Sequence, residues 1–369
     1  MYDGRIAQFT APNEPFVIRE VSLAGRGLLP GEVLVKVTRA NICGSDLHAW
    51  HGRFNTRGLG GKLPTVLGHE MVGVVAGLGE GATHDTAGGA LVEGARVVFP
   101  YFFPCLTCRY CVTGRRAGCA RMSMAMLASS AEPPYYVGGF ADYFLLPAGA
   151  LLYPVPDSLS DEVVSGANCA LSQVMQAYDR AQLTFGETVV VQGAGGLGLY
   201  ATALAKARGA ATVVVVDAVP ERLELARELG ADAVVDIGAE PDERKRVRRV
   251  QDLTDGGADV VMELVGSPAV VGEGIKMLGR YGRYLSVGNI GHGQTYQADP
   301  SRLTLTNKSI IGVSLYEPDA LGKSLRFLDS VRDTLPKRWL ESTAFPLADI
   351  NEAFRAADTR EVVRASIVP

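Results

Sequence analysis

The chain has 369 residues, more than one hydrophobic core usually supports, so we expect two domains. Hydrophobic residues make up 47% and charged residues 21%, which is the profile of a globular protein and excludes a disordered chain. The formal net charge of -4 argues against a nucleic-acid partner, because surfaces that follow a phosphate backbone normally carry an excess of basic residues.

Two further features bear on the compartment. The first five residues show no charged flank leading into an apolar segment, so we expect no secretory signal. The sequence contains no run of about 18 apolar residues, which argues against a membrane-spanning helix and a membrane partner. We therefore expect a cytoplasmic protein. In such a reducing compartment, the clustering of four of the six cysteines indicates metal ligation rather than disulfides.

Residues 1 to about 155 predict short antiparallel strands. Apolar runs such as 33–37 and 96–99 alternate with glycine and proline turns, which is typical of a small barrel-like domain. Residues 83–94 are rich in glycine and alanine and indicate a surface loop.

Candidate metal ligands occur in three separate segments. Cys43 follows a predicted strand, His69 lies in the run Gly68-His69-Glu70, and Cys169 comes a hundred residues later. Two cysteines and one histidine leave a fourth position open, as a catalytic zinc requires. Taken alone, a buried cysteine is more often part of the hydrophobic core, and a single histidine more often makes only ordinary hydrogen bonds. Together with the cluster described next, they give every cysteine of the chain a metal role.

The cysteine cluster has the spacing Cys-x2-Cys-x2-Cys-x7-Cys in a turn-rich segment. Its members are Cys105, Cys108, Cys111 and Cys119. Four thiolates this close in sequence can complete a tetrahedral shell around one zinc and leave no position for water or substrate. The spacing predicts a structural zinc site; four unconnected thiols in a loop are the alternative.

From about Thr188 the pattern changes to alternating strands and helices, which predicts a parallel sheet with crossover helices. A glycine-rich turn connects the first strand, 189–191, to the first helix, 197–207. Such a turn lets a dinucleotide pyrophosphate approach the backbone at the helix N-terminus. Its candidate cofactor-binding residues are Gly193, Gly195, Gly196, Leu197 and Gly198.

Asp217 follows the second predicted strand, 212–216, and stands 19 residues after Gly198. A carboxylate in this position accepts hydrogen bonds from the adenosine ribose and repels a 2′-phosphate. The next basic residue is Arg222, also a candidate cofactor-binding residue. NAD is therefore favoured over NADP; an ordinary turn residue is the alternative reading of Asp217.

Further strands are expected at 234–235, 259–262 and 284–287. The basic run 244–249 precedes an apolar-spaced stretch and is interpreted as a solvated helix face. The alternation stops near residue 315. We predict a catalytic domain over 1–170, a nucleotide-binding domain over 171–314, and a return to the catalytic domain over 315–369.

In this order along the chain, the motifs resemble the zinc-containing alcohol dehydrogenases of the medium-chain dehydrogenase/reductase superfamily, together with polyol and threonine dehydrogenases. The resemblance covers nearly the whole chain. It rests on Cys43–His48, Gly68–Glu70, Cys169-Ala170, the four-cysteine cluster and the glycine-rich turn. It implies an α/β protein, with a GroES-like, mostly antiparallel catalytic domain and a Rossmann domain with a doubly wound parallel sheet. It also implies a homodimer or homotetramer.

The resemblance also implies roles for individual residues. Cys43, His69 and Cys169 would bind a catalytic zinc, with Glu70 beside the metal. Asp46 would orient His69, as metal-bound imidazoles generally require. Polyol dehydrogenases often have a glutamate where this chain has Cys169, so the chain resembles the alcohol dehydrogenases at that ligand. The residues implied to lie beside the nicotinamide are Val265, Val287 and Asn289.

The expected reaction is hydride transfer between an alcohol, secondary rather than primary, and NAD, which yields a ketone or aldehyde. Zinc would act as a Lewis acid and lower the pKa of a bound hydroxyl from about 16 toward about 7. That change corresponds to roughly 12 kcal/mol in favour of the reactive alkoxide. Ser45 would accept the proton and pass it through the cofactor ribose to His48; local hydrogen bonding is the alternative role for both.

Two other functions are compatible with parts of the pattern. A zinc-independent enone or quinone reductase of the same fold would keep the glycine-rich turn and lack the three open-site ligands. A non-catalytic NAD-binding protein would keep the structural zinc alone. Metal analysis separates them, because the enzyme requires about two zinc ions per chain and either alternative about one.

Overall fold

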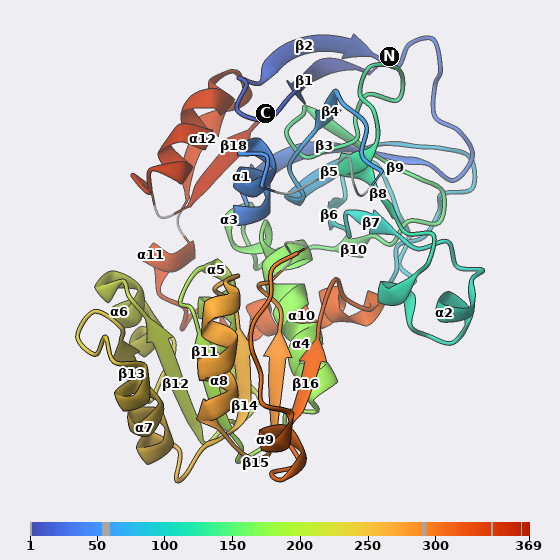
Figure 1. Cartoon of the computed structure of the whole chain (residues 1–369). Coiled ribbons are helices and arrows are strands. Elements are labelled where there is room, and N and C mark those ends of the chain that lie inside the picture. Colours follow the sequence, from blue (N-terminus) through green and yellow to red (C-terminus); the bar gives the residue numbers. More distant parts are fainter. Residues whose placement is uncertain (1, 54–59, 290–292, 341, 363) are drawn as a thin grey trace. The chain divides into compact units, whose positions relative to one another are not determined.

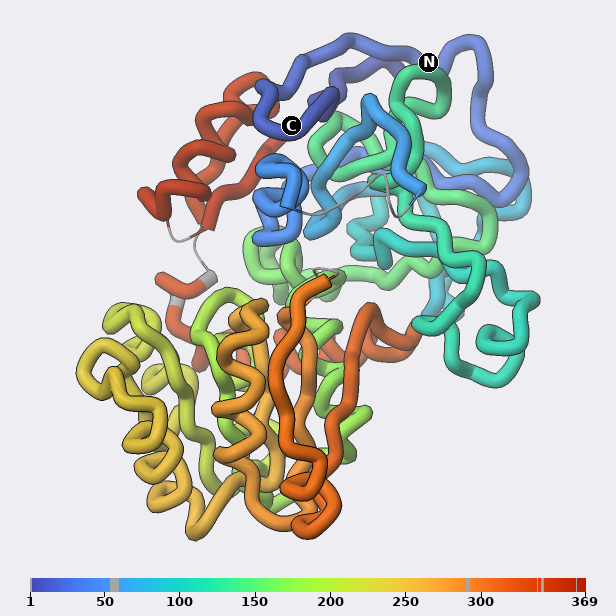
Figure 2. Tube along the Cα trace, in the orientation of Figure 1, coloured from blue at the N-terminus to red at the C-terminus, as the bar shows by residue number. Residues whose placement is uncertain are grey.

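The computed structural model describes residues 2–53, 60–289, 293–340, 342–362 and 364–369. The chain divides into two compact units, Met1–Cys169 with Glu317–Pro369, and Ala170–Tyr316. Figure 2 traces the chain out of the first unit and back into it. The sequence predicts boundaries after residues 170 and 314, one residue later and two residues earlier than these. Within the described ranges, no helix has both the length and the apolar character needed to cross a membrane.

The first unit is built mainly from antiparallel strands (Figure 1). Its largest sheet has seven strands in the order β10-β6-β5-β3-β18-β17, with β9 also paired to β3. A three-stranded sheet, β2-β1-β4, and a two-stranded sheet, β7-β8, complete it. The strands are β1 (Asp3–Phe9), β2 (Val17–Ser22), β3 (Val33–Asn41), β4 (Thr65–Val66), β5 (Glu70–Leu78), β6 (Arg96–Val98), β7 (Phe102–Phe103), β8 (Ser123–Met124), β9 (Tyr143–Leu146), β10 (Tyr153–Pro154), β17 (Thr343–Pro346) and β18 (Ala365–Val368).

Helices of 4 to 14 residues connect these strands. They are α1 (Gly44–Trp50), α2 (Arg109–Val112), α3 (Asp161–Val164), α10 (Pro318–Val331), α11 (Lys337–Leu340) and α12 (Ile350–Asp358). The core of the unit joins strand residues such as Val35 and Phe144 to Ile350 and Phe354 of α12. Strand β18 pairs antiparallel with β3, with Ser366 opposite Asn41. The C-terminal segment is therefore part of the same core as the N-terminal strands.

The second unit is a six-stranded, fully parallel sheet in the order β13-β12-β11-β14-β15-β16. The order reverses at β11, which pairs with both β12 and β14, so the expected doubly wound sheet is confirmed. Its strands are β11 (Thr188–Gln192), β12 (Thr212–Asp217), β13 (Ala233–Asp236), β14 (Ala258–Glu263), β15 (Leu278–Ser286) and β16 (Ser309–Gly312).

The helices of this unit pack in two groups, α4 with α5 and α6, and α7 with α8. Because helices cover both faces, the strands are continuous apolar runs, such as Val213–Val216 in β12, and not alternating ones. The helices are α4 (Ser172–Ala181), α5 (Gly196–Ala207), α6 (Pro220–Glu228), α7 (Glu243–Leu253), α8 (Val271–Met277) and α9 (Pro300–Thr304).

Candidate active site and nucleotide-binding loops

Three side chains from separate segments meet in the first unit. The Sγ atoms of Cys43 and Cys169 and an imidazole nitrogen of His69 all lie within 4.8 Å of one another. Cys43 precedes α1, His69 lies between β4 and β5, and Cys169 lies in a single π-helical turn, Ala167–Leu171. Such turns occur frequently at functional sites. The three residues that the sequence suggests as one set are therefore close enough to hold a metal ion.

Asp46 links the segments that carry two of these ligands. Its carboxylate is fully buried and accepts hydrogen bonds from the Cys43 N–H at 2.9 Å and the Gly68 N–H at 3.2 Å. Its Oδ1 also lies 3.3 Å from His69 Nδ1. This contact directs Nδ1 toward the carboxylate and leaves Nε2 available as a ligand atom.

Gly68 is required by the geometry of the chain before His69. Its φ is +88°, and a Cβ there would lie 2.8 Å from the Phe140 ring. Any larger residue would combine a strained backbone with a steric clash in the core. The turn that presents His69 therefore depends on glycine.

Two buried asparagines fix the other side of the site. Asn168, next to Cys169, accepts from the Met71 N–H at 3.3 Å and donates to the Phe99 carbonyl at 2.8 Å. Asn41 donates to Glu70 Oε2 at 3.4 Å, and its own Oδ1 accepts from two serine hydroxyls. The polar groups around Glu70 are thus connected, which stabilises them despite burial.

The pKa values of Cys43, Cys169, His69 and Glu70 are all shifted, because these titratable groups are buried close to one another. A hydrogen bond from Cys169 and the charge of His69 hold the pKa of Cys43 well below its usual value, and the same hydrogen bond together with burial raises the pKa of Cys169. Burial lowers the pKa of His69, but Asp46 and the Cys43 thiolate outweigh it and raise that pKa. Burial raises the pKa of Glu70 to about 8. A cation bound here would displace protons from these groups.

The two residues expected to move protons lie on α1. The Ser45 hydroxyl is 3.2 Å from His69 Nε2. His48, three residues further along, is exposed in the last turn of the helix. Residues three apart share one helix face, so both side chains lie on one side of α1.

The four-cysteine cluster forms a second group whose sulfur atoms lie within 4.8 Å of one another. Cys108 Sγ is 3.5 Å from Cys111 Sγ and 3.9 Å from Cys119 Sγ. A hydrogen bond from the Thr107 N–H contributes most to lowering the pKa of Cys105 to about 5, whereas burial raises the pKa of Cys111 to about 12. The four cysteine sulfurs can therefore fill all four coordination positions of a tetrahedral metal ion.

In the second unit, the glycine-rich turn lies between β11 and α5. Gly193 has a φ of +96°, and a Cβ on Gly198 would lie 1.8 Å from the Gly193 carbonyl oxygen, so both are required by the turn itself. A Cβ on Gly195 or Gly196 would meet nothing within 4 Å. These two glycines, with half-buried Leu197, leave bare backbone at the N-terminus of α5, where an anion is stabilised.

Asp217 fixes this turn from the end of β12. Its Oδ2 accepts from the Ala194 N–H at 2.6 Å, and its Oδ1 accepts from the N–H groups of Ala218 and Val219, each at 2.8 Å. Arg222 is half-buried in the first turn of α6. Asp217 is 8% exposed, and its Oδ2 keeps capacity for a further hydrogen bond.

Glu263, which the sequence analysis did not identify, organises the next two loops. It is fully buried at the end of β14 and accepts from the N–H groups of Val265, at 2.7 Å, and Gly266, at 2.6 Å. Its other oxygen accepts from Asn289 Nδ2 at 2.7 Å. Val265 is 48% exposed beside this anchor, whereas the Val287 side chain is buried, so of these two valines Val265 is the one whose side chain can contact a ligand. The sequence feature that could have identified Glu263 is its position as a carboxylate directly after the apolar residues of a strand.

Comparison with known proteins gives consistent matches along the chain. Residues 29–157 match the alcohol dehydrogenase GroES-like domain, and residues 196–330 match the zinc-binding dehydrogenase family. A 5-exo-hydroxycamphor dehydrogenase from Pseudomonas putida is 31% identical over 92% of both chains. An erythritol/L-threitol dehydrogenase from Mycolicibacterium smegmatis is 31% identical over 92% of this chain and 91% of its own.

Solved structures agree with these relatives. An alcohol dehydrogenase from Thermotoga maritima superposes with a TM-score of 0.92 at 26% identity, with both chains fully covered. A benzyl alcohol dehydrogenase from Acinetobacter calcoaceticus has a TM-score of 0.84 at 27% identity, over 100% of this chain and 99% of its own.

Two substitutions of Glu263 test whether its hydrogen bonds to the backbone stabilise the protein. Glu263→Ala leaves two backbone N–H groups without an acceptor, so we expect the free energy of unfolding to fall by about 2–4 kcal/mol. Glu263→Gln keeps an acceptor, and a rotated Asn289 amide can restore the second contact, so its loss should stay within about 1 kcal/mol. Urea unfolding of both variants measures this. Equal losses in the two variants would contradict an anchoring role.

Proposed function

Because the chain belongs to the zinc-binding dehydrogenases of the alcohol dehydrogenase family, we propose that it transfers hydride between a secondary alcohol and NAD, at a zinc held by Cys43, His69 and Cys169. The convergence of these three ligand atoms within 4.8 Å carries the proposal. The zinc-independent reductase is not favoured, because it would not need this ligand set. Relatives named for a hydroxycamphor and for erythritol and threitol support an alcohol substrate.

The donors fit the metal. Two thiols and an imidazole are ligands that zinc prefers, and three protein ligands leave one position for substrate. When bound there, zinc supplies Lewis-acid stabilisation of an alkoxide. The protein contributes the orientation of His69 through Asp46 and the burial of Glu70 beside the site. Both contributions come from side chains already held in place in the structure.

The proton released by the alcohol needs a path to solvent. We propose that the Ser45 hydroxyl accepts it and that His48 releases it, as general bases acting in sequence. The position of Ser45 beside His69 Nε2 and the exposure of His48 support this order.

The cysteine cluster is proposed to hold a second, structural zinc. Four sulfur ligands close the coordination shell, so this metal cannot take part in the reaction. Its effect would be on the stability of the segment from Cys105 to Cys119, whose Arg116 and Ala117 N–H groups also donate to Glu317. A cytoplasmic location and a homodimer or homotetramer remain predictions.

A panel of alcohols tests the reaction directly. With NAD and absorbance of the reduced nicotinamide as the readout, cyclic and acyclic secondary alcohols should be oxidised with a higher kcat/KM than benzyl alcohol and other primary alcohols. Turnover of enones or quinones without any alcohol activity would contradict the proposal.

Two cysteine variants separate the proposed metals. Wild type should contain about two zinc ions per chain by mass spectrometry. Cys43→Ala should lower kcat by at least about a thousandfold, because several kcal/mol of charge stabilisation are lost. It should keep its fold and its NAD affinity. Cys108→Ala should instead lower the thermal midpoint and the soluble yield. Loss of activity through unfolding in both variants would show that this division is wrong.

Asp217→Asn tests the preference for NAD. Loss of the negative charge should raise the ratio of kcat/KM for NADP to that for NAD by about tenfold or more. The KM for NAD should also rise, because the amide nitrogen of the new asparagine cannot accept the hydrogen bond from the Ala194 N–H, and the glycine-rich turn loses this contact. Glu221→Gln removes the same charge from an exposed site on α6 and is the matched control. A ratio unchanged by Asp217→Asn would refute this role.

A further inference from the structure

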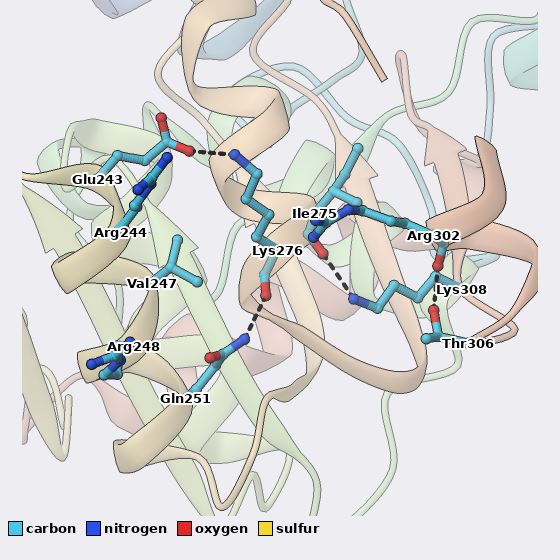
Figure 3. A pocket seen from close by; sticks show the side chains of 10 residues that line it. All are labelled: Glu243, Arg244, Val247, Arg248, Gln251, Ile275, Lys276, Arg302, Thr306 and Lys308. Atoms are coloured by element: carbon cyan, nitrogen blue, oxygen red, sulfur yellow. Dashed lines mark hydrogen bonds and ion pairs between the residues drawn. The ribbon is translucent and has the colours of Figure 1, made fainter. Parts of the chain in front are cut away.

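A cavity of about 540 Å³, open to solvent on one side, lies in the second unit, away from the glycine-rich turn. Figure 3 shows its lining residues, which come from α7, α8, α9 and the segment before β16. Ile275 and Lys276 precede β15, and Lys308 precedes β16, so they lie near the amino ends of the strands. The dinucleotide loops follow the carboxyl ends of strands. The cavity is therefore separate from the proposed cofactor site.

Its lining is strongly basic, although the chain as a whole has a net charge of -4. Five cations face one acid, Glu243; they are Arg244, Arg248, Lys276, Arg302 and Lys308. Figure 3 shows Arg244 and Arg248 on one side, Arg302 and Lys308 on the other, and Lys276 between them. The basic run predicted as a solvated helix face is exposed at Arg244 and Arg248, which stand one helical turn apart and line this cavity.

Hydrogen bonds between the elements hold the walls in place. Arg246, on the same helix, forms a buried two-pronged ion pair with Glu273 of α8, at 2.8 and 2.9 Å. Gln251 Nε2 donates to the Lys276 carbonyl at 3.0 Å, and Lys308 Nζ donates to the Ile275 carbonyl at 3.1 Å. The cations are therefore presented by a fixed frame.

The positive charge is only partly compensated. Lys276 pairs with Glu243 at 2.6 Å, and Arg302 lies 3.7 Å from Asp299, beyond hydrogen-bonding distance. Among the residues that the structure describes, Arg244 and Arg248 form no ion pair. Burial lowers the pKa of Lys308, and the nearby Arg302 adds to this effect. Bound negative charge would relieve this repulsion.

We propose that this cavity binds a small molecule carrying two or more phosphate groups. Arginine guanidinium groups match phosphate oxygens in pairs, and cations on opposite walls provide for two such groups. The volume lies in the range of small-ligand sites, and Val247 and Ile275 offer an apolar floor for a carbon skeleton. The site requires neither zinc nor hydride transfer.

Binding can be measured with inorganic pyrophosphate on the full-length protein by calorimetry, with saturating NAD present to occupy the glycine-rich turn. The variant Arg244→Gln/Arg248→Gln should weaken pyrophosphate binding by about tenfold or more, because each charged hydrogen bond contributes about that much. Affinity should also fall as salt rises.

The matched control is Lys245→Gln/Arg249→Gln, which removes the same charge from exposed positions of α7 that do not line the cavity. It should bind pyrophosphate within about twofold of wild type. Arg302→Gln, from the opposite wall, should reproduce the loss. Equal weakening by both double variants, no weakening by either, or no binding to wild type would overturn the proposal. Circular dichroism and the KM for NAD confirm that each variant is folded.

Discussion

The candidate metal site depends on one buried carboxylate. Asp46 accepts hydrogen bonds from the N–H groups of Cys43 and of Gly68, which precedes His69. It also contacts the His69 imidazole. Two ligands 26 residues apart in the chain are thereby fixed by a single side chain. A buried charge is costly unless its hydrogen-bonding capacity is met, so the same contacts that stabilise Asp46 also determine where the ligands lie.

The second unit repeats this arrangement at the carboxyl ends of its strands. Asp217 accepts three backbone N–H groups around the glycine-rich turn, and Glu263 ties the loops after β14 and β15 together. In each case an acidic residue at the end of an apolar strand substitutes for regular backbone pairing. Irregular loops can then be held as firmly as strands, which is what precise placement of a cofactor requires.

Much of this organisation is predictable from the sequence. Close cysteine spacing and a glycine pattern between a strand and a helix are local signals, so the four-cysteine cluster and the nucleotide turn can be located without a structure. Cys43, His69 and Cys169 are far apart in the chain and are grouped only by the resemblance and because no cysteine is left without a role. Asn41, Asn168 and Glu263 give no such signal, because their partners are distant in the chain. Strand β15 begins six residues before the predicted 284, since Gly279, Arg280 and Gly282 conceal its apolar pattern. The cavity on α7 likewise depends on tertiary packing.

The pairing of β18 with β3 has a consequence for how the protein is made. Ser366 donates to Asn41, which in turn contacts Glu70, so the surroundings of the metal ligands include residues from both ends of the first unit. Residues 170–316 form a continuous stretch and can fold as soon as they leave the ribosome. The first unit is complete only when residues 365–368 emerge and pair with Ala40 and Asn41 at the end of β3, which already pairs with β5 on its other edge and with β9 at its start. Until then the end of β3 keeps a short unpaired edge, the kind of surface at which chains associate wrongly.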